Sequence, residues 1–362
     1  MKSFRKIILT ILILAVAGSM IFFSFEENQK WFVRYLDGFS TQEKEVVEIR
    51  NIPGEGLRYI NGRYLSWNGE KMSVSDESGK TLWERTFLMD DPELVINDSL
   101  IGVYDRLSGE GFAINFNGEV VTHIEEDSNI FSFKPGKEGH IVHIKEEGRE
   151  LLKIYEMDGM HRENLIFIDN YPIDYTLESG AARVTLLELE KDGVATRMVS
   201  YTSEGEEEVY FVPDRVIVKV LSIGSDRLIV TETGIYLQKK DQVVWGRDLP
   251  LLKDVLVDGD EIYAIYGDNL RIIGRDGETI SEETFGIDYE RIHAHGKYIV
   301  LAGEKDLLVF RHMEQIASHS LNWEIVDIRS QFNDLIVTTQ NGVNIVRIED
   351  KEVEDEVEEG AQ

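Results

Sequence analysis

The sequence predicts an all-β fold: an eight-bladed β-propeller that follows one N-terminal transmembrane helix. Two observations predict the propeller. A Gly, Asn or Asp turn followed by a short apolar strand recurs eight times, and successive recurrences lie 34 to 44 residues apart. Such a period is typical of propellers, because a four-stranded blade buries both faces only when neighbouring blades stack on it. An apolar run near the N-terminus predicts the membrane helix. The residues that mark the repeats are Tyr64, Leu100, Ile141, Val184, Leu228, Ile262, Tyr298 and Leu335.

Residues 1–25 are expected to form a cytoplasmic basic tip and a transmembrane helix. The chain is almost wholly apolar from Ile7 to Phe25, and as a helix this run spans roughly 28 Å, close to the ~30 Å of a hydrocarbon core. The basic residues Lys2, Arg5 and Lys6 precede the run, whereas two glutamates follow it. The positive-inside rule therefore places the N-terminus in the cytoplasm and the propeller outside the cell.

A cleaved signal peptide is the alternative for the same segment. Residues 15–17, Ala-Val-Ala, resemble a signal-peptide cleavage site, but the apolar run continues past them to Phe25. This length favours a helix that is retained as a membrane anchor.

Residues 26–44 are expected to form a juxtamembrane connector. Its apolar residues have roughly helical spacing, which fits either an amphipathic helix at the membrane surface or a stalk that continues the membrane helix. These residues are Trp31, Phe32, Tyr35, Leu36 and Phe39.

The propeller is expected over residues 45–350. In the first blade, four strands are separated by Gly-containing turns that supply the positive φ of tight hairpins. The strands are expected at 57–60, 63–67, 71–76 and 81–87.

The final blade contains three strands of its own, at 325–328, 334–338 and 343–348, before the chain becomes almost entirely acidic. A strand at 45–50 precedes the first blade and has the alternation of a partner for the last one. This pairing would close the ring and remove two exposed sheet edges. Seven blades remain an alternative, and the acidic tail at 351–362 is expected to be disordered.

Two repeats share a Leu-Trp or Val-Trp signature, at Trp83 and Trp245, which are 162 residues apart. Equivalent positions in separate repeats indicate that both tryptophans pack between blades. The stretch Asp76-Glu-Ser-Gly-Lys-Thr-Leu-Trp83 resembles the repeats of quinoprotein-like (PQQ-repeat) propellers. The whole chain resembles the DUF5711 family of membrane-anchored bacterial proteins.

The resemblance implies a fold of stacked four-stranded blades, and DUF5711 brings no assigned activity or catalytic residues. Quinone-dependent dehydrogenases of similar shape carry a vicinal cysteine pair beside their cofactor. This chain has no cysteine, so it departs from that pattern. Non-catalytic relatives, such as the assembly scaffold of the outer-membrane insertion machinery, are the closer analogues.

Charge and composition exclude several classes of function. The formal charge is −30, with 68 acidic against 38 basic residues, which argues against binding to nucleic acid. The lack of cysteine excludes disulfides and thiolate chemistry. The sequence also lacks a G-x-S-x-G nucleophile element and a glycine-rich phosphate loop. We therefore expect no cofactor and assign no catalytic residue.

The metal-site candidates are His293 and His295, which alternate along one strand and so share a face. They could hold zinc if a third ligand converged on them, with Glu290 or Asp288 the nearest acidic residues. The alternative interpretation is a pair that faces solvent at a blade edge.

These observations predict a single-pass cell-membrane protein that displays its propeller outside the cell. We expect it to act as a non-catalytic scaffold or sensor with protein partners in the cell envelope. The alternative is an enzyme or a binder of small molecules or metals that uses the central channel.

Overall fold

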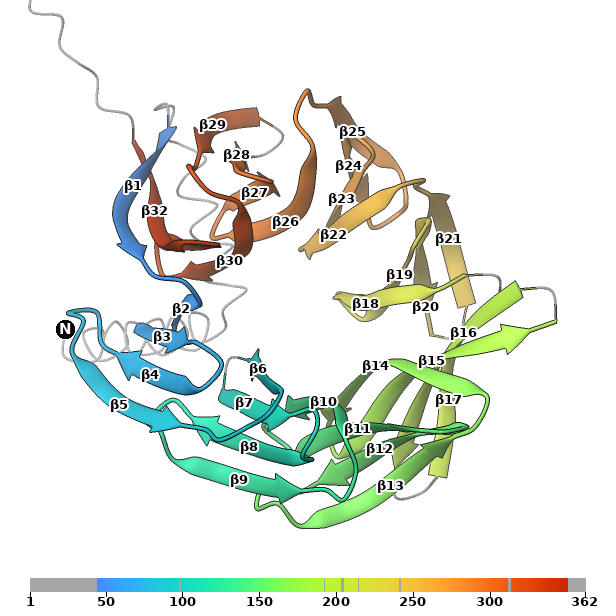
Figure 1. Cartoon of the computed structure of the whole chain (residues 1–362). Helices are drawn as coiled ribbons and strands as arrows, with labels where there is room; N and C mark the ends of the chain where they lie inside the picture. Colours follow the sequence, from blue (N-terminus) through green and yellow to red (C-terminus); the bar gives the residue numbers. More distant parts are fainter. Residues whose placement is uncertain are drawn as a thin grey trace, which may run out of the picture.

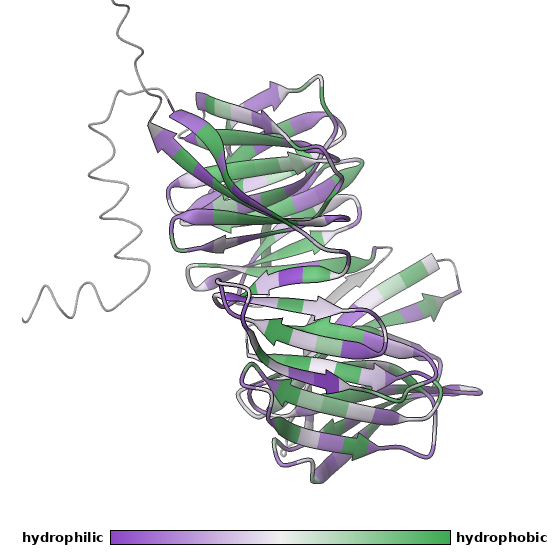
Figure 2. Cartoon of the chain, turned by 60° about the vertical axis from the view of Figure 1, so that its left-hand side comes forward, coloured by the Kyte–Doolittle hydropathy of each residue, from purple (hydrophilic) through white to green (hydrophobic). Residues whose placement is uncertain are grey.

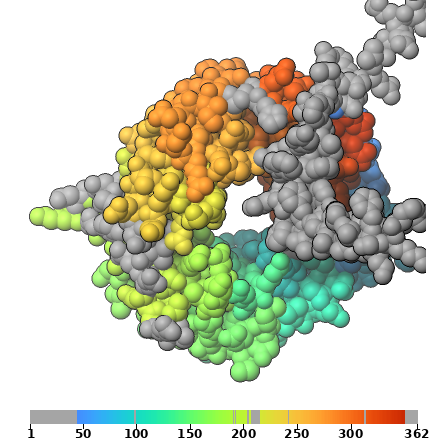
Figure 3. All heavy atoms as spheres, turned by 180° about the vertical axis from the view of Figure 1, so that it is seen from behind, coloured from blue at the N-terminus to red at the C-terminus, as the bar shows by residue number. Residues whose placement is uncertain are grey.

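The computed structural model describes residues 44–350 apart from 98, 192, 203–204, 214, 241 and 312–313, and these residues form an eight-bladed β-propeller (Figure 1). Each blade is a four-stranded antiparallel sheet. The all-β prediction and the count of eight blades are confirmed, so the seven-bladed alternative is wrong. Seen from behind, the blades surround a central opening (Figure 3).

Blades 1–7 are built from four consecutive strands each, and the first strand of every blade lies nearest the channel (Figure 1). Blades 1–4 consist of β2 (Leu57–Ile60), β3 (Arg63–Trp67), β4 (Lys71–Ser75), β5 (Thr81–Thr86); β6 (Pro92–Ile96), β7 (Leu100–Asp105), β8 (Glu110–Asn115), β9 (Val120–Glu125); β10 (Ile130–Pro135), β11 (His140–Glu146), β12 (Arg149–Tyr155), β13 (His161–Phe167); and β14 (Asn170–Glu178), β15 (Ala181–Glu190), β16 (Gly193–Thr202), β17 (Gly205–Pro213).

Blades 5–8 have the same strand order, except that the outermost strand of blade 8 is supplied by the start of the described chain. They consist of β18 (Ile217–Ile223), β19 (Asp226–Thr231), β20 (Gly234–Lys239), β21 (Gln242–Asp248); β22 (Leu252–Asp258), β23 (Glu261–Tyr266), β24 (Asn269–Gly274), β25 (Thr279–Thr284); β26 (Tyr289–His295), β27 (Tyr298–Gly303), β28 (Asp306–Arg311), β29 (Glu314–Ser320); and β30 (Ile325–Gln331), β31 (Asp334–Thr339), β32 (Gly342–Asp350), β1 (Lys44–Pro53).

Strand β1 closes the ring, as the sequence predicted. It pairs antiparallel with β32, with Val46 opposite Ile348 and Ile52 opposite Val343. Val46 is buried against blade 7 and blade 8 residues, so the closing strand also contributes to the core. The first and last strands of the described chain thus share one sheet, and neither edge of the ring is left open.

All eight residues that mark the repeats lie on the second strand of a blade and are buried, from Leu228 at 0% exposed to Tyr298 at 8%. Alternate residues of these strands contact the two neighbouring sheets, which is why the strands read as nearly continuous apolar runs. Figure 2 shows apolar segments along the strands and polar residues in many of the turns. Burying one aliphatic side chain of this kind contributes roughly 1.5–3 kcal/mol.

Trp83 and Trp245 join neighbouring blades, as their spacing indicated. The indole of Trp83 donates to the Phe116 carbonyl at 3.1 Å, and the indole of Trp245 donates to the Arg275 carbonyl at 3.1 Å. Each ring covers the turn glycine of the next blade so closely that a Cβ on that glycine would lie 2.8–2.9 Å from ring carbons. We call each pair of tryptophan and turn glycine a clamp.

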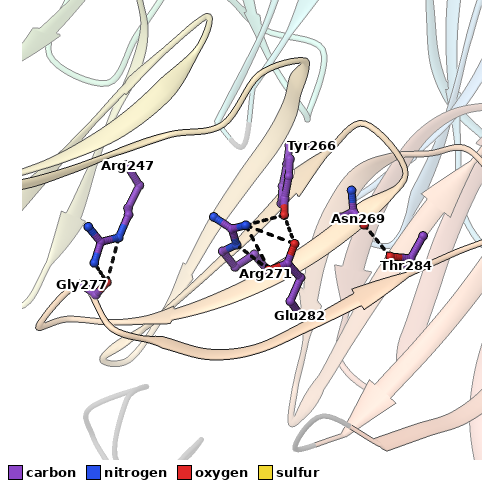
Figure 4. Close-up of polar contacts among 7 residues, drawn as sticks. All are labelled: Arg247, Tyr266, Asn269, Arg271, Gly277, Glu282 and Thr284. Carbon is purple, nitrogen blue, oxygen red and sulfur yellow. Dashed lines mark hydrogen bonds and ion pairs between the residues drawn. The ribbon is translucent and has the colours of Figure 1, made fainter.

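An arginine two residues after each tryptophan adds hydrogen bonds to the clamp. The Arg247 guanidinium donates to the Gly277 carbonyl from Nη2 at 2.7 Å and from Nε at 3.1 Å (Figure 4). Arg85 makes the equivalent bond to Gly118 at 3.2 Å. The outer strand of one blade is thus fastened to the last turn of the next.

The interfaces between blades differ in size. Those between blades 5 and 6 and between blades 7 and 8 contain large clusters of buried apolar side chains. The interface between blades 4 and 5 contains a small cluster, in which Ile217 and Ile229 are the buried members and Met198 packs against them. Among the side chains that the structure describes, blades 4 and 5 thus share only this small cluster.

The two ends of the propeller are defined by strand order. The eight connections between blades, and the turns between second and third strands, lie at one end, which we call the loop face. The connections are residues 54–56, 87–91, 126–129, 168–169, 214–216, 249–251, 285–288 and 321–324. The turns between first and second strands and between third and fourth strands lie at the other end, the turn face. First strands therefore run from the loop face to the turn face.

The expected transmembrane helix at 1–25, most of the connector at 26–44 and the acidic tail at 351–362 lie outside the described residues. Within the described part of the chain, no helix has the length and apolar character needed to cross a bilayer.

Candidate functional site

A cavity of about 890 Å³ opens where the channel meets the turn face. Its lining comes from blades 1, 2, 7 and 8, which are brought together by ring closure although they lie far apart in the sequence. The lining includes Tyr59, Glu77, Asn97, His293, Arg329 and Phe332. Charged and polar groups from several blades thus face one space.

Tyr59 and Glu77 form the blade 1 side of this cavity. The Tyr59 hydroxyl donates to Glu77 Oε1 at 2.5 Å, and Arg50 donates to the Glu77 carbonyl at 3.0 Å. Burial and the adjacent Glu77 carboxylate raise the pKa of Tyr59, so its hydroxyl keeps its proton at neutral pH. Tyr59 is a fixed donor here, and one Glu77 oxygen is engaged by it.

His293 and His295 lie on the first strand of blade 7 and converge on Ser330 of blade 8. His293 Nε2 is 2.7 Å and His295 Nδ1 is 3.0 Å from Ser330 Oγ, and His295 Nε2 is 3.2 Å from the Asn333 carbonyl. His295 is only 5% exposed, so the interpretation of a solvent-facing pair is wrong for this residue.

Burial keeps both imidazoles neutral. It lowers the pKa of His293 to about 4, with the neighbouring His295 a smaller cause, and it lowers the pKa of His295 as well. A neutral His295 that donates from Nε2 to the Asn333 carbonyl has an acceptor at Nδ1, which faces the Ser330 hydroxyl. The pair therefore links blade 7 to blade 8.

The two acidic residues considered as a third zinc ligand lie at the other end of the strand. Asp288 precedes β26 and forms an ion pair with Lys253. Glu290 is three residues before His293, or ~10 Å along an extended strand. Among the residues that the structure describes, no group of three or more His, Cys, Asp or Glu side chains could hold a metal ion.

Arg329 occupies the blade 8 wall of the channel. Its Nε donates to Asp327 Oδ2 at 2.7 Å. It also lines a second cavity of about 320 Å³, which includes Trp67 and Glu93 and extends toward the loop face. Arg329 thus connects the two cavities along blades 1, 2 and 8.

A second polar cluster lies on blade 6, away from the cavity. Arg271 Nη2 is 3.0 Å from Glu282 Oε2 and 2.7 Å from the Tyr266 hydroxyl, which itself donates to Glu282 (Figure 4). These bonds lower the pKa of Glu282. The three side chains come from three adjacent strands of one sheet, so their bonds tie that sheet together.

Sequence reasoning identified His293 but missed Tyr59, Glu77 and Arg329. No local motif marks these residues, because they face one another only after the ring has closed. Only their positions in the repeat pattern could have indicated them. Glu77 and Phe332 lie in turns, and Arg329 directly follows the strand expected at 325–328.

Comparisons with known proteins support the fold. The sequence pattern of a family described as "Family of unknown function (DUF5711)" matches residues 40–348. No curated protein matches the sequence.

Several solved structures are similar at low sequence identity. BamB from Moraxella catarrhalis aligns with a TM-score of 0.62 at 13% identity, over 85% of this chain and 99% of that one. The WD40 domain of SCAP from fission yeast aligns with a TM-score of 0.52 at 10% identity, over 84% and 98%. Apo AztD from Citrobacter koseri aligns with a TM-score of 0.50 at 12% identity, over 83% and 90%. At these identities the likeness establishes the propeller fold alone.

Proposed function

We propose that this chain, which belongs to the DUF5711 family of unknown function, is a membrane-anchored propeller that acts outside the cytoplasm. In this proposal it serves as a non-catalytic scaffold or sensor that binds proteins of the cell envelope. The observation that carries the proposal is that charged and polar groups in the channel are engaged by bonds within the fold. Glu77 is held by Tyr59, Arg329 by Asp327 and His293 by Ser330.

A closed ring of blades supports this role, because it presents two broad faces on a rigid frame. Loops on a rigid scaffold are a common site of recognition. The net charge of −30 disfavours anionic lipid and nucleic-acid partners and is compatible with basic proteins.

The apolar run at 7–25 and the basic residues before it support the membrane anchor and the external location. We expect the full chain to remain in the membrane during alkaline extraction. We also expect protease added to intact cells to degrade the propeller. Release by alkali, or full protection in cells whose surface is accessible, would refute this part of the proposal.

The function is tested by capture of the full chain from detergent-solubilised membranes after mild cross-linking. The expected result is a reproducible protein partner that is absent when an unrelated protein with the same membrane helix is captured. Failure to recover a partner, together with a melting temperature that rises on addition of zinc or a sugar, would contradict a scaffold role.

Ligand binding in the channel is the second candidate function, because His293, Glu77 and Arg329 come from three blades and line one cavity. The volume of this cavity, about 890 Å³, suits a small polar molecule. A ligand bound there should lose affinity in an Arg329→Gln variant, whereas Arg271→Gln on blade 6 should leave its affinity unchanged.

A further inference from the structure

Large apolar side chains are exposed unevenly over the propeller. Five of the eight connections on the loop face contain one: Leu88, Ile168, Leu251, Ile287 and Trp323. Leu88 is 96% exposed, Leu251 76% and Trp323 49%. These residues lie in different connections, so the apolar groups are spread around the face.

A β-bulge that recurs in several blades exposes four further apolar side chains at the loop-face end of the channel. In blades 3–8, the pairing of the first strand with the second shifts near the start of that first strand. Such a bulge leaves one residue unpaired and re-aims its side chain. In four of these blades that residue is apolar and exposed: Phe131, Ile173, Val218 and Val326.

Three further exposed apolar residues, Leu107, Tyr171 and Leu189, lie in a turn or at a strand end on the same face. The loop face thus holds twelve of the 21 large apolar side chains that are exposed in the described part of the chain. The turn face holds Phe332 and Met160, and the remainder lie on outermost strands.

Acidic residues accompany the apolar ones on the loop face. Ile168 is followed by Asp169, Ile287 by Asp288 and Trp323 by Glu324. Seven of the eight connections contain no lysine or arginine; the exception is the one that holds Arg215. The turns between second and third strands, on the same face, contain three basic residues, Arg106, Lys191 and Lys305, and six acidic ones. Connections and turns together hold 15 acidic and four basic residues. The surface therefore combines exposed apolar groups with negative charge.

The ends of the described chain lie on the opposite side. Lys44, at the start of β1, pairs with Asp350, at the end of β32, and both lie at the turn-face end of blade 8. The segments that flank the ring therefore join it on the turn face. A partner can reach the loop face without competing with the connection to the membrane that the proposed function assumes.

From this arrangement we infer that the loop face is a docking surface for a polypeptide segment that presents apolar side chains flanked by lysine or arginine. This inference rests on the proposed function and names the partner class. The apolar side chains supply burial, and the acidic residues supply attraction and orientation. A second copy of this chain is disfavoured, because its own loop face is acidic. An anionic lipid surface is disfavoured for the same reason.

The test uses the full chain in phosphatidylcholine nanodiscs and a short fluorescent peptide of alternating leucine and lysine. Binding is followed by anisotropy against empty nanodiscs. A serine–lysine peptide and a leucine–glutamate peptide separate the apolar and charge contributions. We expect the leucine–lysine peptide to bind at least about tenfold more tightly than either, with an affinity that falls as salt is raised.

Paired variants locate the site. Leu251→Ser with Trp323→Ser on the loop face should weaken binding of the leucine–lysine peptide by about tenfold or more. The matched control, Phe332→Ser with Met160→Ser, removes exposed apolar groups from the turn face and should change the affinity by less than about twofold. All four side chains are exposed, so both variants should fold.

Three results would overturn the inference: equal binding of the serine–lysine peptide, unchanged binding by the loop-face variant, or an equal loss in the turn-face control. The inference and the proposed function can fail separately. A captured envelope partner that is retained by the loop-face variant would remove the inference and leave the scaffold role. If no partner is recovered but peptide binding still depends on the loop face, the scaffold role would be refuted, and the loop face would remain a docking surface.

Discussion

The turn face and the loop face of this propeller are built from the same eight repeats, yet they use their residues differently. At the turn face, glycines, histidines and tryptophans are engaged in contacts between blades, as in the Trp245–Gly277 clamp and the His293–Ser330 contact. At the loop face, Leu88, Leu251 and Trp323 are exposed. The comparison shows that the turn face uses glycine, histidine and tryptophan residues in contacts between blades, whereas the loop face leaves large apolar side chains exposed.

Two tryptophans give the sharpest contrast. Trp245→Ala should lower the free energy of unfolding by about 3 kcal/mol, because it removes a large ring and leaves the Arg275 carbonyl without its donor. Trp323→Ala should lower it by no more than about 0.5 kcal/mol. Chemical denaturation of the two variants measures both values. Equal losses would break the distinction between the faces.

Acid should lower the stability that buried histidines at the turn face contribute to the fold. Burial lowers the pKa of His140, at the turn-face end of β11, to about 4, and that of His293 to about 4. Because the unfolded chain binds these protons near pH 6.5, stability should be complete above that pH and should fall as the pH drops toward 4. For His140 the loss is about 2–3 kcal/mol.

The measurement is a series of unfolding curves between pH 7 and pH 4. His140→Gln keeps a polar group near Thr122 but removes the titrating ring, so its stability should depend less steeply on pH. A slope identical to that of the unmodified chain would show that His140 does not carry the effect. Asp105, whose pKa is lowered to about 2, adds a further loss only below about pH 4.

Two glycines with similar backbone angles allow the cost of a steric clash to be separated from the cost of backbone strain. Gly277 has φ +86°, and a Cβ added to it would lie 2.9 Å from the Trp245 ring, whereas Gly69, on the loop face, has φ +92° and space for a Cβ with no atom within 4 Å. Gly277→Ala should therefore cost about 2–3 kcal/mol and Gly69→Ala about 1 kcal/mol. Thermal unfolding of both variants tests this, and a larger loss in Gly69→Ala would reverse the comparison.

The smallest expected effect concerns the cavity. Tyr59→Phe removes the bond to Glu77 and should cost about 1 kcal/mol. Leu251→Ser, at an exposed loop-face position, should stay within about 0.5 kcal/mol. If Tyr59→Phe proved neutral, the Tyr59–Glu77 pair would be free for a ligand, and channel binding would become the stronger candidate function.

Much of the fold could be predicted from sequence because each blade repeats a local pattern. The apolar second strands, the Asn61-Gly62 turn and the closing strand at 45–50 are all readable within one repeat or by counting strands. Trp83 and Trp245 could be assigned to packing because they recur at equivalent positions. Each of these features depends on residues whose role is the same in several blades.

The cavity and the loop face could not be predicted in the same way. Glu77, His293 and Arg329 are brought together by closure of the ring. The sequence of a single repeat therefore does not show that they line one cavity. The bulges that expose Phe131 and Val218 depend on strand register, which periodicity does not resolve. Glu290 and Asp288, considered as a third ligand for the histidine pair, lie at the other end of β26, because residues that are close in sequence are far apart along an extended strand.

The most direct test of the account is photo-cross-linking from single positions of the full chain in its native membrane. A photoreactive residue replaces Leu251 or Trp323 on the loop face, or Phe332 or Met160 on the turn face. The account predicts one specific protein cross-linked from the loop-face positions, through a segment that carries apolar residues beside lysine or arginine. The same protein cross-linked with equal yield from Phe332 and Met160, or from these alone, would contradict it.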